Sequence, residues 1–197
     1  MLKKYEKKIG HINLGPFEVT SDKLVISDPC YHLGTWCMGT ISNVEPGLWT
    51  ASIGVVDTGD FGKRIAYLSA FHQDSPDIRD LKVCPASFEV GVDSVQAGIF
   101  DFGHFQDESV IEDQELTDFG SRWFTFCCYQ TLDSEHHAGL IPYGVVASSG
   151  FGDGKYYTET GKADNPVCGV LFDFELVRME QVMHHLVSRQ ARGGTRH

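Results

Sequence analysis

The sequence predicts a single, mostly β domain: an antiparallel β-sandwich or barrel-like sheet with about two packed helices. Turn residues, among them 21 glycines, recur along the whole chain, and short apolar runs lie between them. Only two segments show the periodicity of a helix. A chain of 197 residues with 42% hydrophobic side chains has the size and the core of one domain. We therefore take residues 1–197 as one globular unit, with basic ends at 1–9 and 189–197 that we expect to fray.

The strand candidates are apolar runs bounded by turn residues. Glu45-Pro46-Gly47 separates two of these runs, and a glycine-rich segment at 150–154 separates another two, so we expect a hairpin at each place. In chain order the candidate strands are 23–27, 36–42, 48–56, 64–71, 87–92, 145–149, 156–158 and 168–177.

The last candidate strand contains an aspartate between apolar residues. One of its faces carries Val170, Phe172, Phe174 and Leu176. Asp173 falls on the opposite face beside Leu171, and a carboxylate in such surroundings is destabilising unless it has a partner. The partners that we consider are Lys155, Arg64, a backbone turn and a metal ion.

Two segments have a helical apolar stripe. The first is 115–132, with Phe119, Trp123, Phe126 and Cys127, and the second is 179–189, with Met179, Val182, Met183, Leu186 and Val187. The acidic segment 106–118 before the first stripe is expected to be a solvated loop.

Charge and composition exclude several classes of function. A net charge of −11 repels a phosphate backbone, so we expect no nucleic-acid partner. No run of 18 apolar residues is present and residues 9–20 lack the apolar core of a signal peptide, which predicts a cytoplasmic protein without a membrane partner. In that compartment the six cysteines are expected to be reduced, and no zinc-binding spacing is present, so we predict no metal site.

Four segments carry more polar and glycine residues than ordinary turns require. They are 27–31 (Ser-Asp-Pro-Cys-Tyr), 93–101 (Asp-Ser-Val-Gln-Ala-Gly-Ile-Phe-Asp), 148–156 (Ser-Ser-Gly-Phe-Gly-Asp-Gly-Lys-Tyr) and 172–174 (Phe-Asp-Phe). These segments resemble a family of bacterial and phage proteins known as domain of unknown function 4241. The resemblance spans about residues 20–175 and is dense only at the last three segments, and this chain has Val95 where the family has a small residue. It implies a compact, mostly β fold and no particular activity.

The candidate ligand-binding residues come from these segments: Asp28, Cys30, Tyr31, Asp93, Gln96, Asp101, Gly152, Asp153, Tyr156 and Asp173. Each has two interpretations. Asp28 can cap the turn that follows it, or it can lie with Cys30 at a strand end where Cys30 acts as a nucleophile. The oxygen atoms of residues 93, 96 and 101 can bind a divalent cation or hold a polar turn. The glycine-rich segment can bind an anion or form a hairpin.

The function hypotheses follow from these alternatives. The leading one is a module that binds a small molecule or a protein partner through a polar pocket of Asp, Cys, Tyr and Gln side chains. The alternative is a hydrolase that uses carboxylates with a divalent metal ion, or Cys30 as nucleophile. A third hypothesis is a structural or host-interaction protein whose contact is the acidic segment 106–118. No cofactor is indicated, and we expect the four segments to converge in space.

Overall fold

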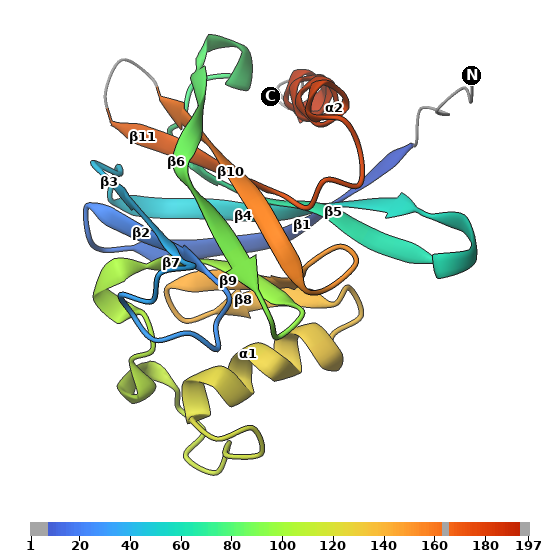
Figure 1. Ribbon diagram of the computed structural model, residues 1–197. Coiled ribbons are helices and arrows are strands. Elements are labelled where there is room, and N and C mark those ends of the chain that lie inside the picture. Colours follow the sequence, from blue (N-terminus) through green and yellow to red (C-terminus); the bar gives the residue numbers. More distant parts are fainter. Residues whose placement is uncertain (1–7, 163–165, 194–197) are drawn as a thin grey trace.

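The computed structural model describes residues 8–162 and 166–193, and it confirms the mostly β fold with two helices (Figure 1). Two antiparallel sheets pack face to face, and one helix covers the outer side of each. Sheet A contains β1 (Ile9–Val19), β4 (Gly47–Asp57), β5 (Lys63–His72), β6 (Lys82–Val92), β10 (Gly154–Lys162) and β11 (Val167–Asp173). Sheet B contains β2 (Lys23–Ser27), β3 (Gly39–Ser42), β7 (Gln96–Asp101), β8 (Ala138–Ile141) and β9 (Gly144–Ser148). The helices are α1 (Arg122–Leu132) and α2 (Met179–Gly193), with short 3-10 turns η1 (Gly59–Phe61), η2 (Ile78–Asp80), η3 (Phe102–His104) and η4 (Glu108–Val110).

The strand order gives the sandwich partly closed sides. Sheet A has the order β1-β4-β5-β11-β10-β6, and sheet B the order β3-β2-β7-β9-β8. The edge strand β6 approaches the loop that leads into β3 of sheet B, and there the Gly91 N–H donates to the Cys37 carbonyl oxygen at 2.8 Å. A parallel bridge between Val44 and Val167 joins the β3–β4 connection to β11. The architecture therefore lies between a sandwich and a barrel.

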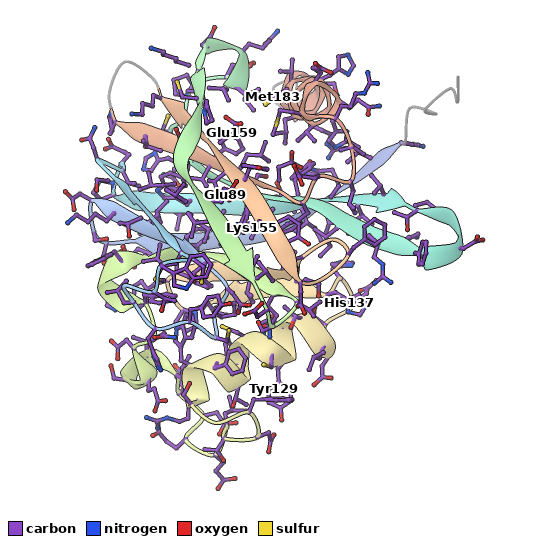
Figure 2. The ribbon with its side chains drawn as sticks, viewed as in Figure 1. Glu89, Tyr129, His137, Lys155, Glu159 and Met183 are labelled. Atoms are coloured by element: carbon purple, nitrogen blue, oxygen red, sulfur yellow. The ribbon has the colours of Figure 1, made fainter. Side chains whose placement is uncertain are left out.

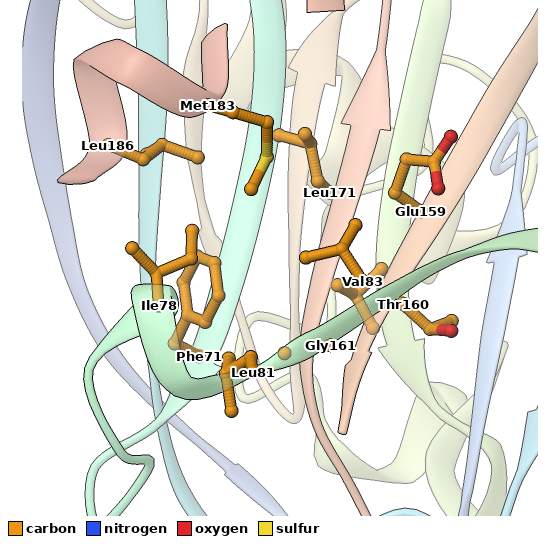
Figure 3. A pocket seen from close by; sticks show the side chains of 12 residues that line it. Phe71, Ile78, Leu81, Val83, Glu159, Thr160, Gly161, Leu171, Met183 and Leu186 are labelled. Atoms are coloured by element: carbon orange, nitrogen blue, oxygen red, sulfur yellow. The ribbon is translucent and has the colours of Figure 1, made fainter. Parts of the chain in front are cut away.

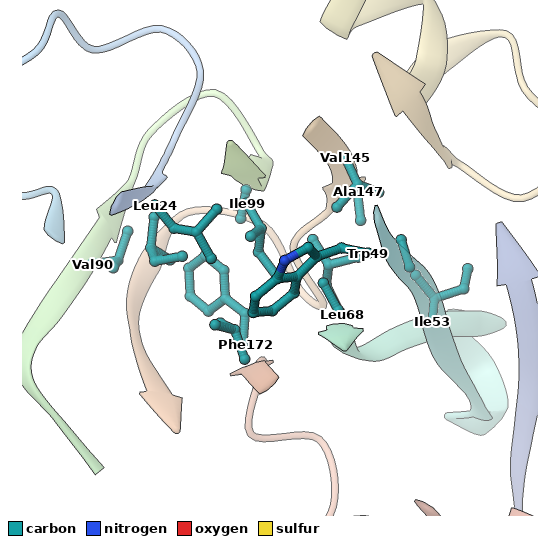
Figure 4. Close-up of a cluster of buried hydrophobic side chains, with 14 of the residues drawn as sticks. Leu24, Trp49, Ile53, Leu68, Val90, Ile99, Val145, Ala147 and Phe172 are labelled. Atoms are coloured by element: carbon teal, nitrogen blue, oxygen red, sulfur yellow. The ribbon is translucent and has the colours of Figure 1, made fainter. Parts of the chain in front are cut away.

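The main core fills the space between the two sheets (Figure 4). Its largest side chain is Trp49, which is fully buried and donates its indole N–H to the Glu45 carbonyl oxygen at 2.9 Å. The surrounding side chains include Leu24, Ile53, Leu68, Ile99, Val145 and Phe172. Each of these contributes about 1.5–3 kcal/mol by leaving water, so this layer is the main source of stability.

Helix α1 covers the outer face of sheet B, and it is shorter than the predicted 115–132 segment. Residues 115–121 are not helical, because Gly120 adopts a φ of 100° and Ser121 is the N-cap, its hydroxyl accepting from the Phe124 N–H at 3.2 Å. The expected stripe is confirmed only from residue 122 onward, where Trp123 and Cys127 pack on Phe100 of the sheet.

Helix α2 covers the outer face of sheet A on the opposite side of the molecule (Figure 1). Val182 and Leu186 are buried against Tyr67 and Leu171 of the sheet, as the predicted stripe at 179–189 requires. None of the helices in the described ranges has the length and apolar character needed to cross a membrane.

Two predicted hairpins are wrong, because each turn connects one sheet with the other. The turn at 45–47 leads from β3 in sheet B to β4 in sheet A, and the glycine-rich segment leads from β9 in sheet B to β10 in sheet A. A sharp turn between two apolar runs has the same sequence whether the strands pair or separate.

The chain ends also differ from expectation. Residue 9 begins β1 and residue 189 lies within α2, so the basic ends are shorter than predicted, and residues 1–7 and 194–197 lie outside the described residues. The sequence did not predict β1, whose alternation is interrupted by a bulge between Asn13 and Gly15.

Candidate functional site

Asp28 lies in the first polar segment, 27–31, and its side chain binds the second segment, 93–101, directly. Its Oδ2 accepts the backbone N–H groups of Asp93 at 2.8 Å and of Ser94 at 2.7 Å, which form the turn between β6 and β7. Its Oδ1 accepts the Cys30 N–H at 2.9 Å and the Ser94 hydroxyl at 2.5 Å. The side chain is fully buried. Four donors therefore hold one carboxylate that would otherwise be costly to bury.

The local sequence explains why Asp28 takes this position. Pro29 disfavours the helical conformation at the preceding residue, so the chain stays extended when it leaves β2. Ser27 donates its hydroxyl to the Asp28 carbonyl oxygen at 2.7 Å, which satisfies another buried polar atom. The capping role predicted for Asp28 is thus present, and it reaches 66 residues along the chain to Ser94 as well as to the adjacent turn.

A second clamp holds the loop 28–38 from its outer side. The Gln106 amide donates to the carbonyl oxygens of Pro29 at 3.2 Å and of Tyr31 at 2.9 Å, and its Oε1 lies 3.2 Å from Nδ1 of His32. Gln106 has a φ of 60°, a conformation that is uncommon outside glycine. The Tyr31 hydroxyl also donates to the Asp93 carboxylate. The loop is therefore fixed both to the β6–β7 turn and to the segment after η3.

This clamped loop exposes two large apolar side chains. Leu33 is 49% exposed and Trp36 is 85% exposed. The backbone between them is held by two further turn bonds, from the Thr35 N–H to the His32 oxygen at 3.1 Å and from the Met38 N–H to the Thr35 oxygen at 3.3 Å. A rigid loop thus presents an indole ring to solvent.

Cys30 does not have the surroundings of a nucleophile. Burial, followed by the hydrogen bond to Asp28 and the negative charge of that residue, raises the pKa of the Cys30 thiol to about 12. A reactive cysteine needs a lowered pKa and an adjacent base. His32, the neighbouring base in the sequence, has its ring nitrogen directed to Gln106 instead. All six cysteines have free thiols.

Gln96 lies at the start of β7 under helix α1. It is buried, and its amide nitrogen lies 3.4 Å from the Cys128 sulfur, while its carbonyl oxygen has no partner among the described residues. The side chain faces the protein interior and is not available to an external ligand.

The glycine-rich segment folds on itself and contacts the second motif. The Tyr156 hydroxyl donates to the Gly152 oxygen at 2.6 Å, and the Ser149 hydroxyl donates to the same oxygen at 2.8 Å. The Ser149 N–H donates to the Val95 carbonyl oxygen at 2.9 Å. Asp153 is exposed. These bonds use carbonyl oxygens of the segment and the Ser149 N–H, so they build a compact turn, and the anion-binding interpretation stays a prediction.

Asp101 lies at the far end of β7 and serves another connection. It is fully buried and accepts from the Thr20 hydroxyl at 2.7 Å, the Ser21 N–H at 3.0 Å and the Ser21 hydroxyl at 2.5 Å. It therefore caps the β1–β2 turn, and it does not share a cation site with Asp93 and Gln96.

Asp173 ends β11 on the outer face of sheet A, opposite Tyr67 and Tyr157 in the neighbouring strands. It is 7% exposed and accepts one hydrogen bond, from the Glu175 N–H at 2.9 Å. Burial, with a smaller contribution from the negative charges of Glu175 and Glu159, raises the pKa of Asp173 to about 6. Of the partners considered, the backbone turn is the one present.

The predicted convergence is confirmed for the four segments and wrong for their carboxylates. Asp28 binds the 93–94 turn, Val95 contacts the glycine-rich segment, and that segment packs on Phe174, whose ring centroid lies 5.4 Å from that of Tyr156. Only the first of these contacts involves a carboxylate. The Val95 contact is a backbone hydrogen bond, and the Phe174 contact is between aromatic rings. Asp173 and Asp101 each face a different turn, because carboxylates in this fold act as separate capping groups.

Sequence reasoning missed Gln106 and Trp36. Gln106 lies in the acidic segment 106–118, which the sequence predicts as a solvated loop. The only feature that sets this residue apart in the sequence is its amide side chain among carboxylates. Trp36 was assigned to a strand, because an aromatic residue before Met38 fits an apolar run. The nearby Gly34 and the Asp28-Pro29 pair were the available signals for a loop.

The described residues contain no group of three or more His, Cys, Asp or Glu side chains that could hold a metal ion. Comparison of the chain with protein-family models, with curated proteins and with solved structures gives no match in any of the three. The resemblance to domain of unknown function 4241 therefore stays a prediction.

Proposed function

We propose that this protein is a protein-binding module whose contact surface is the loop region built on Asp28. The observation that carries the proposal is the distribution of exposed apolar side chains. Of the ten large hydrophobic residues exposed in the described part of the chain, four lie on the Asp28 loop, on the 93–95 turn or on the glycine-rich segment bonded to that turn, and a fifth, Phe61 of η1, contacts one of them. The four are Leu33, Trp36, Val95 and Phe151.

The two parts of this surface are linked through the 93–95 turn. On one side, Tyr31 binds Asp93 and anchors the loop that carries Trp36. On the other side, Val95 lies against Gly152, and the exposed rings of Phe151 and Phe61 meet edge to face with centroids 5.8 Å apart. Exposed apolar groups gathered on rigid loops are typical of interaction sites, and tryptophan is among the residues that contribute most to binding.

The choice of a protein partner over a small molecule rests on shape. Trp36, which is 85% exposed, projects from the loop surface into solvent, and a hollow with mainly apolar walls lies elsewhere, beside helix α2. A projecting indole ring fits a pocket on another macromolecule. The net charge of −11 favours a partner with a basic surface. The raised pKa of the Cys30 thiol, about 12, argues against the form of the hydrolase alternative in which Cys30 is the nucleophile.

A photo-crosslinking experiment tests the proposal. Trp36 is replaced by the photoreactive residue p-benzoylphenylalanine, and Leu132, which is 59% exposed at the end of α1, is replaced in the same way as the control. We expect the first position to give an adduct of one defined mass with a single protein, and the control to give none. Equal adducts from both positions would contradict a dedicated surface.

Affinity for the captured protein then measures the role of the ring. We expect Trp36→Ala to weaken binding at least about tenfold, which corresponds to about 1.4 kcal/mol. The matched variant Leu132→Ala should leave the affinity unchanged. Since Trp36 is 85% exposed, its replacement should not shift the melting temperature, so a loss of binding cannot be ascribed to unfolding.

A further inference from the structure

Helix α2 packs on the outer face of sheet A at two places. Toward β10, Met183 and Leu186 lie over Leu171, and this contact is apolar (Figure 3). Met183 is on the side of the helix that is turned to the sheet (Figure 2). Toward β1, the helix presents His185, whose ring lies against that of His11. The apolar contact carries no ionisable group, so any pH dependence of docking rests on the histidine contact.

The histidine contact is built on a row of residues that crosses three strands of the sheet. His11 of β1 pairs with Gly54 of β4, and Gly54 pairs with Tyr67 of β5. A Cβ atom at Gly54 would lie 2.0 Å from the Tyr67 ring, so the glycine lets this ring lean across β4. The Tyr67 hydroxyl then lies 3.5 Å from Nδ1 of His11. The His185 ring covers both, with centroids 5.9 Å from His11 and 6.4 Å from Tyr67.

Both imidazole rings lie in surroundings that favour their neutral form. Nε2 of His185 is buried and has no hydrogen-bond partner within the described ranges. Burial, followed by the positive charges of Arg189 and His185, lowers the pKa of His11 to about 4. Burial, followed by the charges of Arg189 and His184, lowers the pKa of His185. A proton on either ring would need water or a carboxylate to compensate its charge.

The charged groups closest to the two rings are cations. On α2, Arg189 lies one helical turn after His185 and acts on both rings, and His184 acts on His185. On β5, Arg64 pairs with Val56, whose side chain belongs to the same outer cluster. Each of these side chains, when charged, opposes a further positive charge in the contact.

The carboxylates of the neighbouring strand and of the helix do not reach the two rings. Asp173 of β11 pairs with Tyr67, which places it three strands from His11, a separation of about 14 Å. Glu180 is exposed in the first turn of α2, and five residues along a helix rotate its side chain about 140° away from that of His185.

The acids of turn η2 are engaged within that turn. It packs with α2 through the apolar side chain of Ile78. Its carboxylates, Asp77 and Asp80, act on Arg79 of the same turn. The histidine contact is therefore surrounded by apolar and positively charged groups, which disfavour protonated rings.

We propose that α2 is an acid-released cover of sheet A, which proton uptake by His11 and His185 undocks while the two sheets stay folded. Release of the helix breaks no strand pairing, because α2 is the last element of the described residues and follows every strand. Its side chains belong to the outer cluster, and the core between the sheets contains none of them. The device is separate from the Asp28 loops, and it stands whether or not those loops bind a protein.

The direction of the pH dependence follows from the lowered pKa values. The ordinary pKa of histidine is 6.5 and that of His11 in the docked state is about 4, so undocking takes up a proton between these values. The contribution of neutral His11 to docking is complete above pH 6.5 and is lost as the pH falls to about 4. A fully desolvated ring would favour the undocked helix about 30-fold at pH 5, and because His11 is half-buried we expect about tenfold.

Amide hydrogen exchange of the full-length protein, followed by NMR, tests the proposal. Protection factors, which correct for the pH dependence of the intrinsic exchange rate, are compared for Val182 and Leu186 of α2 and for Ile53 of β4. We expect the protection of the α2 amides to fall about tenfold from pH 7.5 to pH 5, with Ile53 far better protected than the helix at both values. Unchanged protection of α2, or equal protection of helix and sheet at pH 5, would overturn the proposal.

Histidine variants separate protonation of this contact from a general effect of acid. The double variant His11→Phe/His185→Phe keeps two rings in the contact that cannot take up protons, so its α2 protection should no longer fall at pH 5. His184→Phe makes the same change at the exposed neighbouring position and should retain the tenfold fall. The same fall in the double variant as in the native protein would overturn the proposal. The comparison of α2 with β4 in the native protein decides the question even if the double variant fails to fold.

Discussion

Asp28 and Asp173 are buried carboxylates at the ends of strands β2 and β11, and the surroundings of the two differ. Asp28 accepts four hydrogen bonds, three from backbone N–H groups and one from the Ser94 hydroxyl. Asp173 accepts one, from the Glu175 N–H, and lies near the negative charges of Glu175 and Glu159. The Asp28 carboxylate stabilises the folded state by its hydrogen bonds, whereas the ionised Asp173 carboxylate destabilises it through burial and repulsion by nearby negative charges.

This difference decides what each region can do. A carboxylate whose lone pairs are filled by the protein cannot bind a ligand without breaking a turn. Asp28 therefore positions other residues, among them those of the loop that exposes Trp36. Asp173 accepts a single hydrogen bond and lies near other negative charges, so its side chain is held far less tightly than that of Asp28.

The largest expected effect is that of Asp28→Ala. The change leaves the N–H groups of Cys30, Asp93 and Ser94 without an acceptor, so we expect a loss of about 4 kcal/mol in the free energy of unfolding. Urea denaturation followed by tryptophan fluorescence measures it. Asp153→Ala, at an exposed position, serves as the control and should stay within about 0.5 kcal/mol. A loss below about 1 kcal/mol for Asp28→Ala would remove the contrast between the two regions.

The opposite sign is expected for Asp173→Asn. The pKa of Asp173 is about 6 in the folded protein and its ordinary value is 3.8, so the folded state holds the proton more tightly. Its contribution to stability is complete below pH 3.8 and is lost as the pH rises to about 6, a change of about 3 kcal/mol for about two pH units.

An asparagine keeps an acceptor for the Glu175 N–H and carries no charge. At pH 8 we therefore expect the variant to be more stable than the native protein by about 2–3 kcal/mol, and this gap should close by pH 4. Unfolding curves at several pH values measure it. A gap that does not depend on pH would show that Asp173 acts through packing instead of charge.

The smallest expected change in the free energy of unfolding is that of Val95→Gly, in the turn that Asp28 binds. Val95 has a φ of 63°, a left-handed conformation that is strained for a β-branched residue, and it is 48% exposed. Val95→Gly should relieve the strain and stabilise the protein by about 1 kcal/mol in urea denaturation. Gln106→Gly, at a similar φ, should destabilise instead, because its amide bonds to Pro29 and Tyr31 are lost. Destabilisation by Val95→Gly would mean that the side chain supports the turn.

Much of the fold could be predicted because alternation and helical stripes are local signals. The last strand shows this well: Val170 and Phe172 reach the core and Asp173 falls on the other face, as the two-residue period requires. The sequence could not predict which of the two sheets a strand joins after a turn. Whether the chain after Ser148 pairs with the preceding strand or crosses to the other sheet depends on partners that lie far along the sequence.

The candidate site was predicted in part. The segment around Asp28 was correctly linked to the turn at Asp93, but the pattern does not reveal that the carboxylate is saturated, since hydrogen-bond donors from a distant turn leave no local trace. The histidine contact under α2 could not be predicted, because Tyr67 reaches His11 only through strand pairing and His185 approaches them from another element.

The order of strands in sheet A also sets the course of folding. β4 and β5 are consecutive and can form early, yet β5 must then wait for β11, with Phe71 pairing with Gly169, and the edge strand β6 must wait for β10. Such non-local pairing lowers folding rates. During synthesis the first three strands of the sheet emerge long before the strands that complete it. The nascent chain therefore exposes an open sheet edge until β10 and β11 have left the ribosome, and we expect this interval to be the one in which aggregation competes with folding.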